Sequence, residues 1–288
     1  MADCVGSGEK VFHGRKCMND RIFGAVTGAV REAGEIVREH WQQEKNVRFK
    51  GAIDLVTRTD LAVEETLKQT LSGIVPEADF LAEETAADRD PGSLTWIIDP
   101  VDGTTNFAHG IPAVAVSVAL WQKDRIEAGW VYLPMMGRNG ELFSARQGRG
   151  AFLNGEPIRV SDTGTVSRSV IATGFPYSIR HKLDEIMPRV SRVLAASQGI
   201  RRFGSAATDL VYTAMGRFDG FFEQDLNPWD VAAGWLIVEQ AGGRVTGYDP
   251  AGSYALGAKK ILATNGRIHE ELEAILRDEA FEDVRTDL

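Results

Sequence analysis

The stretch that decides the fold and the site is WIIDPVDGTTNFAHG, residues 96–110. Apolar residues lead directly to two aspartates, Asp99 and Asp102, which stand close to one another around a proline. A turn usually needs only one Asp or Asn beside a glycine, so a plain turn whose aspartate caps the next helix is one interpretation. Two acids at the end of a predicted strand, followed at once by Gly103 and Thr104, favour a functional loop.

The composition describes an ordinary globular protein. The chain has 288 residues, 43% of them hydrophobic and 25% charged, which fits one large α/β domain or two closely packed halves. Its net charge of -9 argues against nucleic acid as a partner, because binding the phosphate backbone needs clustered basic residues. A phosphate substrate would also be repelled, unless bound cations reverse the field at the site.

Compartment and membrane signals are sparse. The only two cysteines, Cys4 and Cys17, form no CxxC motif, so we expect no structural zinc and a reducing, cytoplasmic setting. Residues 1–18 lack the apolar run of a signal peptide and are predicted to be disordered. The apolar run IPAVAVSVALW, residues 111–121, is too short to span a bilayer and predicts a buried strand. We therefore expect no membrane role.

Hydrophobic periodicity divides the chain into two halves. It predicts helices over 20–43, with Asp20 as N-cap, and over 60–72, and then a run of strands typical of an antiparallel sheet. From about residue 165 strands and helices alternate, which indicates a layered α/β half. The predicted organisation is a disordered segment 1–18, an α+β half over 19–155 and an α/β half over 156–288. The predicted strands lie at 95–99, 113–122, 125–134, 140–145, 150–155, 169–175, 199–204, 219–224 and 259–265, and the later helices at 181–197, 205–217, 229–243 and 269–280.

Three further segments place acids where they could join the first pair. They are LAEETAA with Glu83 and Glu84, DLVTRTD with Asp60, and NPWDVAAG with Asp230. Each also has an ordinary interpretation: a solvated acidic pair, the N-cap of the second helix, and an acid at a helix N-terminus. From the residues alone these alternatives stay open.

Binding of hard divalent cations would explain why these acids come together. Mg²⁺ prefers oxygen ligands, and two such ions about 4 Å apart can stabilise both the attacking and the leaving oxygen of a phosphoryl transfer. The carbonyl of Val101 could join the carboxylates as a ligand. Gly103 and Thr104 can begin a helical turn whose free amides face an anion, and the Thr104 hydroxyl could orient water with Asp60 or Glu83.

The chain resembles the inositol monophosphatase superfamily of Mg²⁺-dependent, lithium-sensitive phosphatases from about residue 20 to about residue 275. WIIDPVDGTTNF matches its first signature and WDVAAGWLIVEQAGG its second, while AEET and DLVTRTD fit two shorter segments. The resemblance implies an α+β fold, a layered αβαβα sandwich, and a phosphoric monoester hydrolase that binds roughly two or three Mg²⁺ ions per site. It also implies a homodimer and a small phosphorylated substrate.

The same resemblance implies roles for individual residues. The implied metal ligands are Glu83, Asp99, the carbonyl of Val101, Asp102 and Asp230. The implied phosphate-binding amides are those of Gly103 and Thr104, with Thr104, Asp60 and Glu83 placing the water. The implied contacts to substrate hydroxyls are Glu223 and the backbone at Ser205 and Ala206.

Departures from the family pattern bear on the substrate. Ala82 replaces a usual glycine, and Asn227 stands where animal members commonly have a histidine. GFPY resembles bacterial members, several of which act on other phosphates. The predicted substrate is inositol 1-phosphate, and the alternatives are fructose 1,6-bisphosphate, histidinol phosphate and 3'-phosphoadenosine 5'-phosphate. A regulatory or binding protein that has lost catalysis is the alternative of another class.

Overall fold

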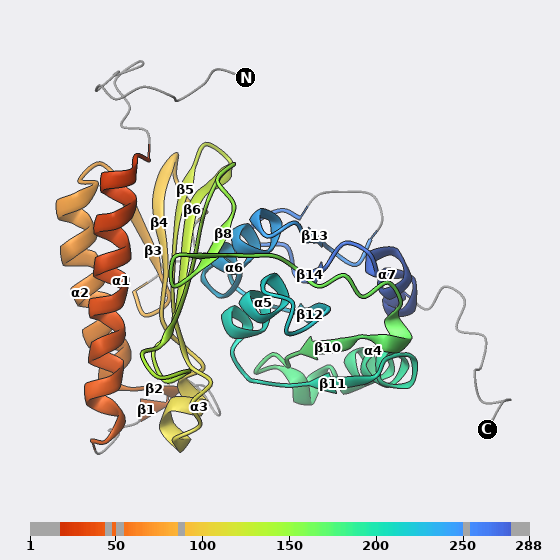
Figure 1. Ribbon diagram of the computed structural model, residues 1–288. Helices are drawn as coiled ribbons and strands as arrows, with labels where there is room; N and C mark the ends of the chain where they lie inside the picture. The colour runs from red at the N-terminus through yellow and green to blue at the C-terminus, as the bar shows by residue number, and fades with distance from the viewer. Residues whose placement is uncertain (1–17, 44–47, 50–54, 86–89, 250–253, 278–288) are drawn as a thin grey trace, which may run out of the picture.

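The computed structural model describes residues 18–43, 48–49, 55–85, 90–249 and 254–277. Helices and sheets alternate in five layers within this part of the chain (Figure 1). This confirms the predicted layered αβαβα sandwich. The prediction for residues 1–17, which include both cysteines, lies outside the described residues, whereas Met18 is buried.

The first layer consists of helices α1 (Asp20–Trp41) and α2 (Arg58–Ile74). The side chain of Asn19 accepts a hydrogen bond from the amide of Ile22 at 2.9 Å, so Asn19 is the N-cap of α1 and the prediction of Asp20 was wrong. Helix α2 is capped by Thr57, with Asp60 as the reciprocal acid of a capping box. Asp60 is therefore not an N-cap. Strands β1 (Arg48–Phe49) and β2 (Leu55–Val56) form a short hairpin-like pair nearby.

A seven-stranded sheet forms the second layer, in the order β3-β4-β5-β6-β7-β8-β9. Strand β3 runs parallel to β4, and every other neighbouring pair is antiparallel, which confirms the predicted character of this sheet. Strand β9 pairs with β8, so the sheet continues past residue 155, and the division into halves stays a prediction. The strands are β3 (Asp79–Ala82), β4 (Leu94–Asp102), β5 (Ala115–Gln122), β6 (Arg125–Leu133), β7 (Glu141–Arg146), β8 (Ala151–Leu153) and β9 (Glu156–Ile158).

Helices α5 (Ala206–Ala214) and α6 (Pro228–Gln240) form the central layer between the two sheets. Helix α6 is apolar around most of its circumference because it packs in the middle of the molecule. The close approach of β6 to α6 requires a glycine: a Cβ atom at Gly129 would lie 3.0 Å from the Cα atom of Ala233. The largest apolar cluster joins this layer to the inner faces of both sheets.

The fourth layer is a five-stranded mixed sheet in the order β11-β10-β12-β14-β13, and α4 (Leu183–Ala196) and α7 (His269–Arg277) cover it. Strand β10 is parallel to β11 and β12, while β14 is antiparallel to β12 and β13. The short strand β13 was not predicted. The strands are β10 (Val170–Thr173), β11 (Gly199–Arg201), β12 (Gly220–Gln224), β13 (Arg244–Thr246) and β14 (Lys260–Thr264).

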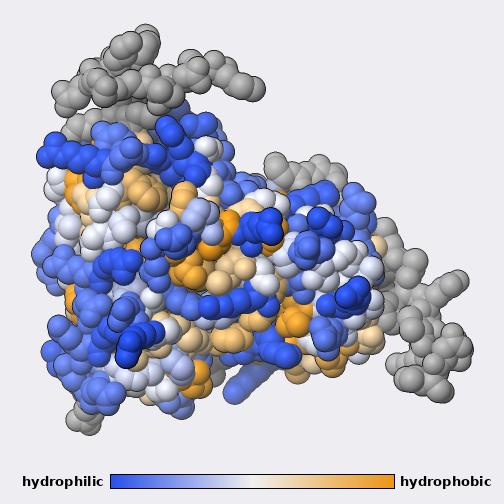
Figure 2. Space-filling model, viewed as in Figure 1, coloured by the Kyte–Doolittle hydropathy of each residue, from blue (hydrophilic) through white to orange (hydrophobic). Residues whose placement is uncertain are grey.

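The hydropathy of the surface follows the position of the layers. Figure 2 shows a mainly hydrophilic exterior over the first helical layer, with apolar patches toward the middle of the viewed face. Within the described ranges, no helix is both long and apolar enough to cross a membrane.

Candidate active site

A β-bulge separates the two aspartates of the opening motif. Asp99 pairs with Ser117 of β5, and Asp102 pairs with Ala115, so three steps along β4 match only two along β5. Successive side chains of a regular strand point to opposite faces, and residues three apart would therefore face opposite ways. The extra residue at Pro100–Val101 reverses the alternation.

The two cores confirm this reversal. Before the bulge, Ile97 packs toward the central helices, while Trp96 and Ile98 pack under α1 and α2. After the bulge, Val101 packs on the α1/α2 side. Asp99 and Asp102 consequently lie on the same face of the sheet, toward the central layer.

Asp102 is fixed by the start of helix α5. Its Oδ2 atom accepts hydrogen bonds from the hydroxyl of Ser205 at 2.8 Å and from the amide of Ala207 at 2.6 Å. Burial raises the pKa of Asp102 to about 6, although these hydrogen bonds oppose the shift. Ser205 was predicted as a backbone contact to substrate, and its side chain has this further role that the sequence did not suggest. The predicted substrate contacts of Ser205 and Ala206 stay predictions.

Four carboxylates interact electrostatically at this end of the sheet. Burial raises the pKa of Asp99 well above its usual range, and the charges of Glu83, Asp102 and Asp230 raise it further. A side-chain hydrogen bond between Asp99 and Glu83 acts in the same direction. Burial and the charge of Asp102 also raise the pKa of Asp230. The structure thus brings together all four acids that were predicted to share a site.

Asp230 retains its helical role as well. Its Oδ2 atom accepts a hydrogen bond from the amide of Asn227 at 2.6 Å, at the N-terminus of α6. The ordinary interpretation and the functional one are therefore compatible. One oxygen atom of Asp230 accepts the hydrogen bond at the helix N-terminus, and the charge of the carboxylate still contributes to the acidic cluster.

The Thr104 hydroxyl lies between two acceptors. Its Oγ1 atom is 3.0 Å from Asp60 Oδ1 and 3.0 Å from the carbonyl oxygen of Val101. The other carboxylate oxygen of Asp60 accepts hydrogen bonds from the amide of Thr57, at 2.9 Å, and from the Thr57 hydroxyl. Both oxygens of Asp60 are therefore positioned, and burial raises its pKa.

Gly103 leads from β4 into the short helix α3 (Thr104–His109) with a φ angle of 94°, which favours glycine. The first amides of a helix have no acceptor within it. Asn106 fixes this turn to distant backbone, because its Nδ2 donates to the carbonyls of Ala113 and Phe203, each at 2.7 Å. The predicted anion-binding turn therefore has a rigid support.

Two further buried acids, Glu223 on β12 and Asp209 on α5, interact electrostatically with Asp102. Burial and the charge of Asp102 raise the pKa of Glu223 to about 8, and Arg202 opposes the shift. Asp209 was not predicted, although it is buried and neither of its oxygens has a hydrogen-bond partner among the described residues. A Cβ atom at Gly174 would overlap the Glu223 carboxylate, so this glycine makes room for the acid.

Glu64 of α2, also missed from the sequence, fixes the turn that carries Glu83. Its carboxylate accepts hydrogen bonds from the amide of Glu84 at 2.9 Å and the hydroxyl of Thr85 at 2.5 Å, and pairs with Lys68 at 2.8 Å. Glu64 is 2% exposed. In the sequence it is one more acid on an amphipathic helix, with no signal of this contact.

The donor set fits a hard divalent cation. The acids supply only oxygen atoms as ligands. Burial and, after it, their mutual repulsion raise the pKa values of Asp99 and Asp230. A bound cation would favour the ionised carboxylates. Over the described ranges, no three acidic, histidine or cysteine side chains already stand together as ligands of one ion.

A bulged strand that gathers buried acids next to a glycine-led helix start favours chemistry on a phosphate ester. The model of the inositol monophosphatase family matches residues 18–280, and the chain belongs to this family. It is accordingly a phosphoric monoester hydrolase.

Known proteins and solved structures match this chain over most of its length. The inositol-1-monophosphatase of Synechocystis sp. is 42% identical over 253 residues, or 87% of each chain. The crystal structure of the extragenic suppressor protein suhB from Bartonella henselae has a TM-score of 0.82 and 38% identity, covering 91% of this chain and 100% of that one. The staphylococcal structure described as inositol monophosphate bound SaIMPase-II has a TM-score of 0.74 and 25% identity, covering 90% and 94%.

Proposed function

We propose that this chain hydrolyses a small polyol phosphate monoester, with inositol 1-phosphate as the best candidate, to the free alcohol and inorganic phosphate. The observation that carries the proposal is the bulge at Pro100–Val101, which turns Asp99 and Asp102 to one face beside the start of α3. The inositol-1-monophosphatase name of a 42% identical relative supports this substrate, as does the inositol monophosphate bound to SaIMPase-II.

The proposed cofactor is Mg²⁺. The residues that would hold it are Glu83, Asp99, the carbonyl of Val101, Asp102 and Asp230. When bound, Mg²⁺ supplies positive charge that attracts the phosphate, activates the attacking water and stabilises the leaving oxygen. Ser205 and the amide of Ala207 keep Asp102 in one orientation for this task.

The proton of the attacking water goes toward Asp60. Thr104 Oγ1 donates to Asp60 Oδ1, which leaves a lone pair of the hydroxyl to accept a hydrogen bond from water. As the water oxygen bonds to phosphorus and the ester P–O bond breaks, Thr104 gives its hydroxyl proton to Asp60 and takes the proton of the water. The alcohol oxygen leaves with the electron pair of the broken bond and takes up a proton from solvent. Burial raises the pKa of Asp60, which makes its carboxylate a better proton acceptor.

The amides of Gly103 and Thr104 bind the phosphate oxygens in this proposal, and Glu223 binds hydroxyl groups of the alcohol. Glu223 lies on β12, a strand of the five-stranded sheet that packs against the central helix α5. A polyol presents several hydroxyls that a buried carboxyl group can bind, whereas a simple alkyl phosphate does not.

A substrate panel tests the proposal. Phosphate release would be measured with Mg²⁺ for inositol 1-phosphate, fructose 1,6-bisphosphate, histidinol phosphate and 3'-phosphoadenosine 5'-phosphate. We expect the highest kcat/KM for inositol 1-phosphate. A higher value for another ester would replace the proposed substrate, and no release from any of them would favour a regulatory protein.

A further inference from the structure

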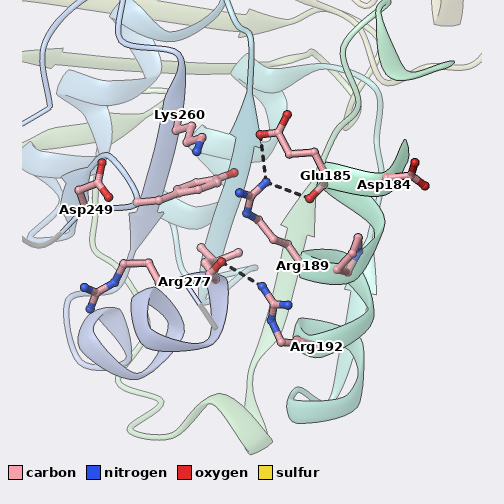
Figure 3. Close-up of a pocket in the computed structure, with 10 residues that line it drawn as sticks. Asp184, Glu185, Arg189, Arg192, Asp249, Lys260 and Arg277 are labelled. Atoms are coloured by element: carbon pink, nitrogen blue, oxygen red, sulfur yellow. Dashed lines mark hydrogen bonds and ion pairs between the residues drawn. The ribbon is translucent and has the colours of Figure 1, made fainter. Parts of the chain in front are cut away.

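A cavity of about 420 Å³ lies in the outer layer, between α4 and α7 (Figure 3). The ring of Tyr248 and strand β14 border it, and Tyr248 is only 4% exposed. None of the proposed metal ligands Glu83, Asp99, Asp102 and Asp230 lines this cavity. Arg189 and Tyr248 also line a smaller neighbouring pocket, which contains Glu223. Its volume falls within the range of small-molecule sites.

The charges around the cavity are sorted by depth. Four cationic side chains line it, and all four are partly buried. Three acids also line it, but all three are exposed. In Figure 3 the carboxylate of Asp184 points away from the other labelled side chains. The cations are Arg189, Arg192, Lys260 and Arg277, and the acids are Asp184, Glu185 and Asp249.

This concentration of partly buried cations is unexpected in a chain with a net charge of -9. A concave surface with low-dielectric walls strengthens the field of the charges that line it. A small anion inside would meet the cations at close range, in competition with Glu185, 3.3 Å from Arg189, and with buried Glu273, 3.7 Å from Arg277. The charges of exposed Asp184 and Asp249 are screened by water. The cavity is therefore electrostatically suited to a multiply charged anion.

The cations are held in place by their neighbours. Arg189 Nη1 lies 3.0 Å from the carbonyl oxygen of Glu185 and 3.2 Å from Gln224 Oε1, and it pairs with the Glu185 carboxylate at 3.3 Å. Arg192 donates to the carbonyls of Ile275 and Leu276, at 2.8 and 3.2 Å, near the end of α7. Fixed guanidinium groups lose little side-chain entropy when they bind an anion.

Lys260 is the most available of these cations. Its ammonium group lies 5.7 Å from the centre of the Tyr248 ring, and the Arg189 guanidinium lies 5.7 Å from the same centre. Lys260 forms no salt bridge with the residues that the structure describes. Its three donors can therefore turn to a ligand without breaking an ion pair.

We propose that this cavity is a second binding site, specific for a small anion with at least two negative charges, such as inorganic phosphate, pyrophosphate or a phosphate ester. Lys260 and Arg189 make the principal contacts, and the Tyr248 ring forms one wall. Phosphate groups suit these residues because ammonium and guanidinium donors form charge-assisted hydrogen bonds with their oxygens.

The test uses the full chain freed of divalent cations with EDTA, because the metal-free acidic cluster repels anions. Calorimetric titrations at constant ionic strength would use orthophosphate, pyrophosphate and glycerol phosphate as separate ligands. We expect pyrophosphate to bind, and Lys260→Gln to weaken its binding about tenfold, or 1.4 kcal/mol. The orthophosphate and glycerol phosphate titrations distinguish a site for inorganic anions from one for esters.

Lys259→Gln is the matched control, since it removes the same charge from the neighbouring exposed residue. Lys259 does not line the cavity, and its backbone carbonyl accepts from the amide of Asp225 at 2.6 Å, its one hydrogen bond to the described residues. Its variant should bind pyrophosphate like the unaltered protein. Equal weakening in both variants would reduce the effect to net charge and overturn the proposal, as would absence of binding to the unaltered protein.

Discussion

The hydroxyl of Thr104 lies 3.0 Å from a carboxylate oxygen of Asp60, although 44 positions separate the two residues. The contact joins the start of α3 to the first turn of α2. Thr104→Ala removes the hydroxyl that we propose orients the attacking water, and we expect kcat to fall about 100- to 10,000-fold with little change in KM. Thr104→Ser keeps the hydroxyl and should stay within about tenfold of the unaltered kcat. Equal losses in the two variants, measured by steady-state phosphate release, would contradict this role.

The acidic cluster predicts opposite effects of one substitution on activity and on stability. Asp99→Asn removes one of several buried like charges, so the metal-free protein should melt at a higher temperature at pH 8, by about 2–4 °C for each kcal/mol gained. The same change removes a proposed Mg²⁺ ligand and should abolish turnover even at saturating Mg²⁺. Melting curves with EDTA and with Mg²⁺, together with the rate assay, test both effects. Near-normal turnover would contradict the proposed ligand set.

The sequence predicted the acids of this site, because motifs that place Asp and Glu beside strand ends and glycines are visible without coordinates. It could not predict how Asp99 and Asp102 come to face the same way. That depends on the bulge, which is a property of how β4 pairs with β5. Short strands such as β13 were missed for a similar reason, since three residues carry too little periodicity and depend on β14 for pairing.

Supporting contacts were also beyond the sequence. Ser205 and Asp102 are 103 positions apart, and Glu64 reaches a turn 20 positions away. Helical spacing places Glu64 on the buried face with Leu67 and Leu71, but it does not show which turn the Glu64 carboxylate contacts. The sequence predicted that polar residues cap both helices, but it placed the caps at the wrong positions. The N-caps are Asn19 and Thr57.

Glu64 leads to a prediction about Mg²⁺ affinity. Because its carboxylate fixes the turn that follows Glu83, Glu64→Ala should weaken Mg²⁺ binding about 10- to 100-fold, the usual cost of losing an outer supporting contact. The measurement is the Mg²⁺ dependence of the melting temperature, with the Mg²⁺ dependence of the rate as a second readout. Saturating Mg²⁺ should restore most of kcat.

Glu65→Ala provides the control for Glu64. It removes the same side chain one position along α2, where Glu65 is exposed and, within the part of the chain that the structure describes, accepts only from Gln69. Its Mg²⁺ dependence should match that of the unaltered protein. A loss of kcat in Glu64→Ala that Mg²⁺ cannot restore would point to general damage of the fold.

Gly174 and Glu223 predict how the alcohol is selected. A methyl group at Gly174 would overlap the Glu223 carboxylate and push it from its place, so Gly174→Ala should act like Glu223→Gln. Both variants should lower kcat/KM for inositol 1-phosphate more than tenfold, about the cost of leaving a buried polar group without its hydrogen-bond partner. Activity toward p-nitrophenyl phosphate, which has no alcohol hydroxyls, should change little. Equal losses on both substrates would contradict a role in selecting the alcohol.

His269, far from the site on α7, predicts how stability depends on pH. Thr246 Oγ1 donates to the carbonyl of Gly247 at 2.7 Å, so it accepts from His269 Nε2 at 2.9 Å. Thr264 Oγ1 accepts from the amide of Gly266 at 3.0 Å and donates to His269 Nδ1 at 2.8 Å. The ring is therefore neutral with its proton on Nε2, and burial lowers its pKa to about 4.

In the unfolded chain His269 takes up a proton near its ordinary pKa of 6.5, whereas in the folded protein it is protonated only near pH 4. The contribution of the neutral ring to stability is complete above pH 6.5 and is lost as the pH falls toward 4, at up to about 1.4 kcal/mol per pH unit. His269→Gln should lower stability at pH 7.5 yet show a shallower decline between pH 6.5 and 4.5 in urea unfolding. His181→Gln, at an exposed position, should keep the steeper decline, whereas equal slopes for the unaltered protein and His269→Gln would show that another group controls the acid sensitivity.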